Sequence, residues 1–92
     1  MLHRCAVMPT ELERQQFAAL VGRHALRSGE GRRLRCSLGF SLRGAARVIG
    51  TDPASLSRWE RSLVVPRMDV AARYGDIVAG WLSVTEVLEG AK

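Results

Sequence analysis

Arginine is the side chain most able to bind a partner in this sequence. Thirteen of the fourteen basic residues are arginines, and eleven of them lie between Gly22 and Arg73, together with four carboxylates. The rest of the chain has three basic and five acidic residues. A guanidinium presents planar donors that match phosphate oxygens, and a local excess of positive charge attracts a polyanion. The charge alone would also fit a solvated surface, but it makes nucleic acid a candidate partner.

Residue combinations typical of catalysis or metal binding are missing from the sequence. His3 and His24 are the only histidines, and no nucleophile-base pair or phosphate-binding loop accompanies them. Cys5 and Cys36 fit neither a disulfide framework nor the spacing of zinc ligands. We therefore expect no enzymatic activity, no metal site and no cofactor.

The elements that must position the arginines are short helices in residues 40–61. Ser41 is a good cap for a helix that ends at Gly50. Asp52 caps the next helix, and Pro53 fits its first turn because the missing donor would be unpaired there. Leu56, Trp59 and Leu63 are expected to form the buried stripe of this helix. Two short helices joined by a tight turn are the pattern of a helix-turn-helix.

The remaining elements are also expected to be helices, which makes the chain a small all-α bundle of about five to six helices. Thr10 and Glu13 form a capping box that starts a helix ending near Ser28. Further helices are expected over 32–38, from about Val70 to Gly80, and over 84–89. The expected organisation is a flexible leader over 1–9, a helical extension over 10–30, a DNA-binding helix-turn-helix domain over 31–82, and a short helix and tail over 83–92.

The helix predicted after Thr10 has one apolar face. Phe17, Leu20, Val21 and His24 share it at helical spacing. This face either completes the core, mediates self-association or docks another protein, and the sequence does not decide among these.

Residues 34–74 resemble the Cro and phage-repressor helix-turn-helix family, also called the xenobiotic-response-element family. The match rests on Leu34-Arg35, Phe40-Ser41, Ala45-Ala46, Gly50, Asp52-Pro53, Leu56-Ser57-Arg58-Trp59-Glu60-Arg61 and Pro66. The resemblance implies a structural ion pair between Arg35 and Glu60. The sequence departs from the family's pattern at Leu42, where the family often has a glutamine that contacts a phosphate. Either Leu42 packs against a neighbouring element, or Ser41 and Arg43 replace the glutamine's phosphate contact.

The resemblance also implies which residues contact DNA. The base-reading residues would be Pro53, Ala54, Ser57 and Arg58, with Arg58 suited to the two acceptors of guanine. The phosphate contacts would come from Ser41, Arg43, Arg47, Arg61 and Arg67. Outside the resemblance, Gly29 and Gly31 interrupt the helical pattern, and Arg32 and Arg33 beside them are candidates for a flexible basic arm that follows the DNA.

The function implied is sequence-specific binding of a double-stranded DNA operator by a transcriptional regulator, most like a phage Cro or repressor protein. Such a protein could bind as a homodimer, reading half-sites about 34 Å apart. The alternative is an antitoxin-like interaction module that binds a protein partner through its N-terminal helix. Because no apolar run nears the roughly 18 residues of a membrane span, we expect a cytoplasmic protein of a bacterium or phage-infected cell, with no membrane partner.

Overall fold

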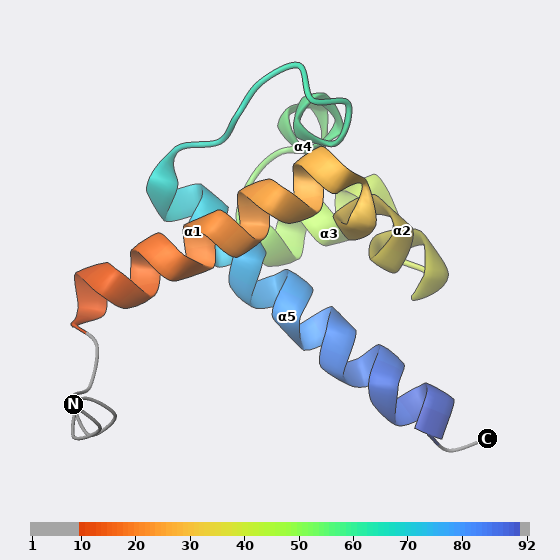
Figure 1. Cartoon of the computed structure of the whole chain (residues 1–92). Coiled ribbons are helices and arrows are strands. Elements are labelled where there is room, and N and C mark those ends of the chain that lie inside the picture. Colours follow the sequence, from red (N-terminus) through yellow and green to blue (C-terminus); the bar gives the residue numbers. More distant parts are fainter. Residues whose placement is uncertain (1–9, 91–92) are drawn as a thin grey trace, which may run out of the picture.

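Five helices make up the part of the chain that the computed structural model describes, residues 10–90 (Figure 1). They are α1 (Glu11–Ser28), α2 (Glu30–Ser37), α3 (Leu42–Ile49), α4 (Pro53–Glu60) and α5 (Met68–Gly90). No strand occurs in residues 10–90, so the predicted all-α fold is confirmed. The leader predicted over 1–9 lies outside the described residues.

The predicted caps start three of these helices. At α1, the Glu13 amide donates to the Thr10 hydroxyl oxygen (3.1 Å) and the Thr10 amide donates to the Glu13 carboxylate (2.8 Å). At α3, the Gly44 amide donates to the Ser41 hydroxyl oxygen. At α4, the Ser55 amide donates to the Asp52 carboxylate. Each cap satisfies a backbone donor that has no partner inside its own helix.

Helices α1 and α5 cross at very close range through small residues. Gly22 lies against the backbone of Ala71, and Gly75 lies against the carbonyl of Ala18, so neither glycine has room for a Cβ. Ala19 is buried in the same contact. This crossing attaches α1 to the helix-turn-helix, because α5 also packs against α2 and α3.

The buried face of α1 is therefore not the one with the large apolar side chains. Ala19, Gly22, Ala25 and Leu26 are buried, whereas Phe17 is 69% exposed and Leu20 is 64% exposed. Of the alternatives left open for the apolar face, completion of the core is excluded for Phe17 and Leu20, because the close approach to α5 needs the small side of the helix.

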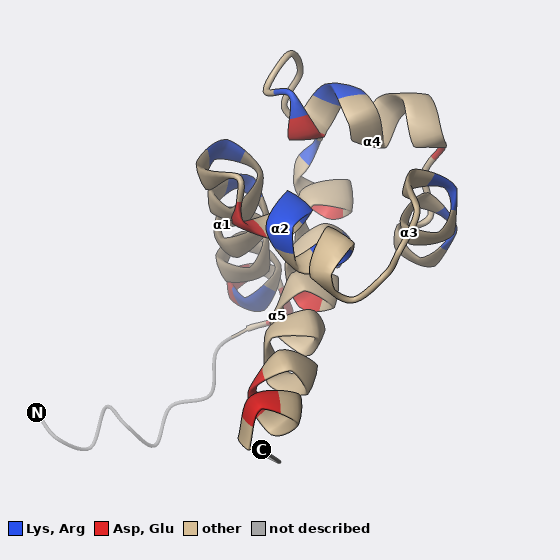
Figure 2. Cartoon of the chain, turned by 90° about the vertical axis from the view of Figure 1, so that its right-hand side faces the viewer, with Lys and Arg blue, Asp and Glu red and all other residues tan. Residues whose placement is uncertain are grey.

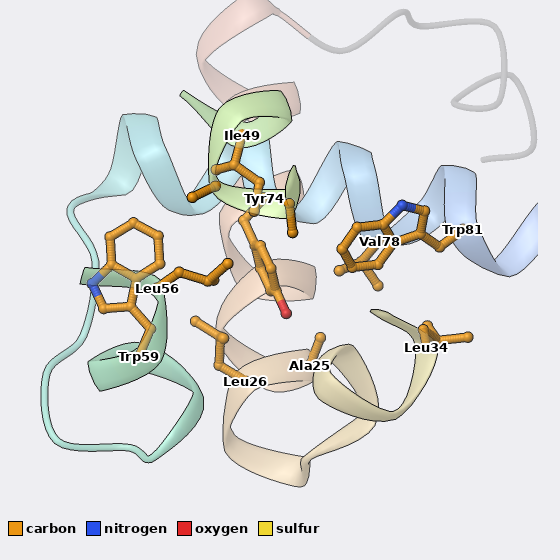
Figure 3. Packing of buried hydrophobic residues seen from close by; sticks show 11 residues of the cluster. Ala25, Leu26, Leu34, Ile49, Leu56, Trp59, Tyr74, Val78 and Trp81 are labelled. Carbon is orange, nitrogen blue, oxygen red and sulfur yellow. The ribbon is translucent and has the colours of Figure 1, made fainter. Parts of the chain in front are cut away.

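Tyr74 of α5 lies at the centre of the main core (Figure 3). It is fully buried and is surrounded by Leu26 of α1, Ile49 of α3 and Leu56 of α4. Trp81 extends the core toward α2 and meets Tyr74 edge-on, with ring centroids 6.4 Å apart. Burial raises the pKa of the Tyr74 hydroxyl, which keeps it neutral. The core therefore fixes α3 and α4 against α5.

Three predicted details of the elements differ from the structure. The expected end of a helix at Gly80 is wrong, since α5 runs unbroken to Gly90. One glycine destabilises a helix by only about 1 kcal/mol, and the buried side chains of Val78 and Trp81 hold this segment on the core. Leu63 is 63% exposed and follows the end of α4, so it does not belong to the buried stripe. Helix α2 starts at Glu30, earlier than expected, because the left-handed Gly29 alone makes the corner after α1. Gly31 then lies inside the helix, where a Cβ would meet the Tyr74 ring and hydroxyl.

In the described part of the chain, none of the helices has both the length and the hydropathy required to cross a membrane.

Candidate nucleic-acid interface

Helix α4 presents one polar face outward. Ala54 and Arg58 are exposed and Ser57 is half-buried on this face, while Leu56 and Trp59 are buried on the opposite side. Pro53 lies half-buried at the start of the helix. The burial of Leu56 and Trp59 sets the rotation of α4, and so the structure places the four predicted base-reading residues along one side of the helix, from its first turn to its last. A short polar face of this kind fits the major groove, which admits one α-helix.

Arg58 is held along α4 by a short chain of hydrogen bonds. Its Nη2 atom donates to the Ser55 hydroxyl oxygen (3.3 Å), and the Ser55 hydroxyl donates to the Asp52 carboxylate (3.3 Å). The hydrogen bond from Ser55 holds the pKa of Asp52 below its usual value, and the nearby charge of Arg58 acts in the same direction. The sequence analysis gave no role to Ser55. Its position three residues after the N-cap Asp52 could have indicated a hydrogen bond to the Asp52 side chain. These two exposed hydrogen bonds direct the guanidinium back along α4 toward its N-terminal end.

The start of α3 combines a hydroxyl, a guanidinium and free backbone donors. Ser41 accepts from the Gly44 amide and keeps its own proton available to donate. The Arg43 side chain is exposed and makes no hydrogen bond or ion pair within residues 10–90. Leu42 is half-buried and packs against the core, so it cannot replace the polar residue that the family often has there. A helix N-terminus with these two side chains suits a phosphate group.

The other predicted phosphate-binding residues lie on three different elements. Arg47 is exposed on α3, and Arg61 is exposed at the end of α4, where its Nε atom donates to the Ser57 carbonyl (3.4 Å). Arg67 precedes α5 and forms an exposed ion pair with Asp69 at 3.5 Å. A phosphate at Arg67 would have to compete with this carboxylate, so Arg67 is the weakest of the three as a phosphate ligand.

Arg35 and Glu60 join α2 to the C-terminal end of α4. The Arg35 Nε and Nη2 atoms donate to the two Glu60 carboxylate oxygens at 2.7 and 2.9 Å, and Nη1 donates to the Phe40 carbonyl at 2.9 Å. The exposed fractions of the two side chains are only 9% and 5%. The hydrogen bond to Glu60 raises the pKa of Arg35, so the guanidinium stays charged although it is buried. This bidentate pair fixes α4 relative to α2 and to the segment before α3.

Arg32 and Arg33 lie on helix α2 and not on a flexible arm. Both are exposed in its first turns, and Arg33 forms an ion pair with Glu30. Gly29 ends α1 in a left-handed conformation with φ of 83°, so the glycine-rich segment is a tight corner between two helices. The arm predicted from these glycines is therefore wrong in its conformation. Whether Arg32 contacts DNA from the helix stays a prediction.

Two arginines that sequence reasoning left without a role hold the loops of the interface. The Arg73 Nε atom donates to the Ile49 carbonyl (3.0 Å), which closes the C-terminal end of α3. The Arg23 Nη2 atom donates to the Pro66 carbonyl (3.1 Å), which ties the loop after α4 to α1. The partners are 24 and 43 residues apart, so no local pattern could have indicated them.

Charge divides the molecule into two ends. Figure 2 shows basic residues on α3 and α4 and acidic residues at the C-terminal end of α5, which points away from them. After Arg73, every charged residue up to Gly90 is a carboxylate: Asp76, Glu86 and Glu89. A polyanion is therefore attracted to the end with α3 and α4 and repelled by the other end.

A family model described as Helix-turn-helix matches residues 32–75, which confirms the resemblance to the Cro and phage-repressor type. This segment, α2 to the start of α5, is therefore a helix-turn-helix domain, a DNA-binding domain of regulatory proteins. Neither the curated proteins nor the solved structures compared with the chain include a match to it.

Proposed function

We propose that the protein is a sequence-specific transcriptional regulator that binds an operator in double-stranded DNA, as phage Cro proteins and repressors do. In this proposal α4 enters the major groove, and Arg58 donates to the two acceptors of a guanine. Ala54 contacts a thymine methyl group, and Ser57 bonds a base or a phosphate. Occupying the operator blocks transcription from an overlapping promoter.

The observation that carries the proposal is the exposed face of α4 beside the capped start of α3. The buried Arg35–Glu60 pair and the core residues Leu56 and Trp59 hold this face rigidly. A preorganised face loses little conformational entropy on binding. Phosphate contacts from Ser41, Arg43, Arg47 and Arg61 would fix the position of α4 along the duplex without selecting a sequence.

The experiment that tests the function is enrichment of duplexes from a random-sequence library with the purified full chain. We expect convergence on one motif that contains a guanine whose replacement abolishes the preference. If Arg58 reads that guanine, the Arg58→Ala variant will enrich a motif in which the guanine position is no longer specified and the other positions are unchanged. The Arg43→Ala variant will enrich the complete motif, but more weakly.

Enrichment without any shared motif would contradict sequence-specific regulation. The helix-turn-helix would then serve as a scaffold, and the alternative of an antitoxin-like module that binds a protein would be preferred. Weak binding that is equal for all duplexes and lost in moderate salt would also contradict sequence-specific regulation, because such binding comes from attraction to the phosphates alone.

A further inference from the structure

Helix α1 has a stripe of exposed side chains that the rest of the described chain leaves uncovered. Phe17 and Leu20 are exposed, as is His24, and Val21 beside them is half-buried. A hollow between α1 and α5 continues the stripe, where Leu20, Val21 and His24 meet Leu82. Contiguous apolar patches of a few hundred Å² on soluble proteins are often interaction sites. The stripe is therefore a candidate interaction surface, separate from the proposed DNA contacts on α3 and α4.

The stripe has the spacing of a helix-pairing seam. Glu13, Phe17, Leu20, His24 and Arg27 follow one another at intervals of four, three, four and three residues, as the seam residues of a coiled coil do. Glu13 and Arg27 are both exposed at the two ends of this seam. A second helix lying along α1 would contact all five side chains.

The charges at the two ends indicate which helix fits. If α1 meets another α1 in antiparallel orientation about a two-fold axis beside Leu20, Glu13 of each copy faces Arg27 of the other. The aromatic ring of Phe17 then faces His24 of the other copy, and the two Leu20 side chains meet at the axis. A parallel arrangement would instead place like charges opposite each other. The seam is thus complementary to itself in one orientation, as a two-fold interface requires.

We propose that the protein forms a homodimer through this antiparallel α1–α1 contact, with Leu82 of α5 at its edge. Phe17, Leu20 and Leu82 expose 69%, 64% and 39% of their surface. Together they supply roughly 300 Å² of apolar area per copy, while a standard interface buries about 800 Å² per partner. The rest would come from the side chains around the stripe, including the apolar stems of the charged ones, because known interfaces are about 56–65% non-polar over their whole area.

The test is the mass of the full chain by sedimentation equilibrium, without DNA, from low micromolar to several hundred micromolar protein. We expect the mass of two chains at the upper end. The double variant Phe17→Ser/Leu20→Ser will show the mass of one chain at every concentration, with unchanged helical circular dichroism because both residues are exposed. Leu12→Ser is the matched control: Leu12 is 56% exposed on another side of α1, and its replacement will leave the dimer intact.

The proposed ion pair has its own test in a double-mutant cycle. Glu13→Gln removes the charge but keeps a residue that can complete the Thr10 capping box, and Arg27→Gln removes the opposite charge. Each is expected to raise the dimer Kd by about tenfold, because the pair occurs twice in the two-fold contact. The two effects will not add if the charges face each other.

Three results would overturn the dimer: a single-chain mass for the unmodified protein at every concentration, a dimer that survives the Phe17→Ser/Leu20→Ser change, or equal loss with Leu12→Ser. Additive effects in the cycle would reject the antiparallel orientation. A monomer that still enriches a DNA motif would refute this inference and leave the proposed function standing.

Discussion

Arg35 and Glu60 form the ion pair of residues 10–90 in which both side chains are almost fully buried. Taking two charges out of water is costly, and the bidentate hydrogen bonds offset that cost only while both partners are present. The ion pair therefore serves mainly to fix the position of the C-terminal end of α4. Losing one partner leaves the other charge buried without compensation.

Arg35→Ala is accordingly predicted to lower the free energy of unfolding by about 3–5 kcal/mol. Arg33→Ala, which removes an exposed ion pair on the same helix, should change it by at most about 1 kcal/mol. Urea denaturation of the two variants measures the difference. Similar small losses for both would mean that the Arg35–Glu60 pair does not hold α4.

Asp52 is predicted to make the free energy of unfolding depend on pH in the acid range. The Ser55 hydrogen bond holds the pKa of Asp52 below its ordinary 3.8, so the charged cap stabilises the fold above that value. The stabilisation is lost as the pH falls from about 4 through the lowered pKa of the folded state. Asp52→Asn keeps a good N-cap without the titration.

Thermal unfolding of the unmodified chain and of Asp52→Asn between pH 6 and pH 2 isolates this contribution. The difference between their melting temperatures should shrink or reverse below about pH 4 in favour of the variant. A difference that stays constant across this range would show that Asp52 does not cap α4 through its charge.

At the scale of elements, the close crossing of α1 and α5 depends on glycines inside helices. Gly75→Ala is predicted to destabilise the fold by about 1–3 kcal/mol, because the new Cβ would collide with the Ala18 carbonyl. Gly80→Ala in the same helix meets open space and should stabilise it by about 1 kcal/mol through helix propensity alone. Differential scanning calorimetry of both variants checks the prediction. The account of the crossing fails if Gly75→Ala is also stabilising.

Helices α3 and α4 could be predicted from the sequence because their ends carry local signals. Ser41, Gly50, Asp52 and Pro53 each act on the turn in which they lie, so their types were sufficient. Leu56 and Trp59 likewise indicated the buried side of α4.

The buried side of α1 could not be predicted in the same way. The apolar stripe of Phe17 and Leu20 was compatible with a core face, but the side of α1 that packs against α5 consists of glycine and alanine. Close packing of such small residues does not appear as a pattern of large apolar residues in the sequence. The break expected at Gly80 was wrong for a related reason, since the tertiary contacts of Val78 and Trp81 outweigh one glycine. Contacts such as Arg23–Pro66 join residues far apart in the sequence, and local patterns do not encode them.

At the scale of the whole molecule, charge and shape together define an orientation on DNA. The arginines of α3 and α4 lie at one end, and the carboxylates of the last turns of α5 lie at the other (Figure 2). The molecule should therefore approach a duplex with α4 leading. If the α1 seam pairs two copies, the same symmetry would give the operator two related half-sites.

The most direct measurement of the central claim is fluorescence anisotropy of the full chain with its enriched duplex and with a scrambled duplex, across a series of salt concentrations. We predict that Arg43→Ala weakens binding to both duplexes equally and lowers the salt slope by about 0.9 per lost phosphate contact. Arg58→Ala should cost about 1–3 kcal/mol on the enriched duplex and much less on the scrambled one. An Arg58→Ala variant that keeps the full preference for the enriched duplex would contradict the assignment of α4 as the helix that reads DNA sequence.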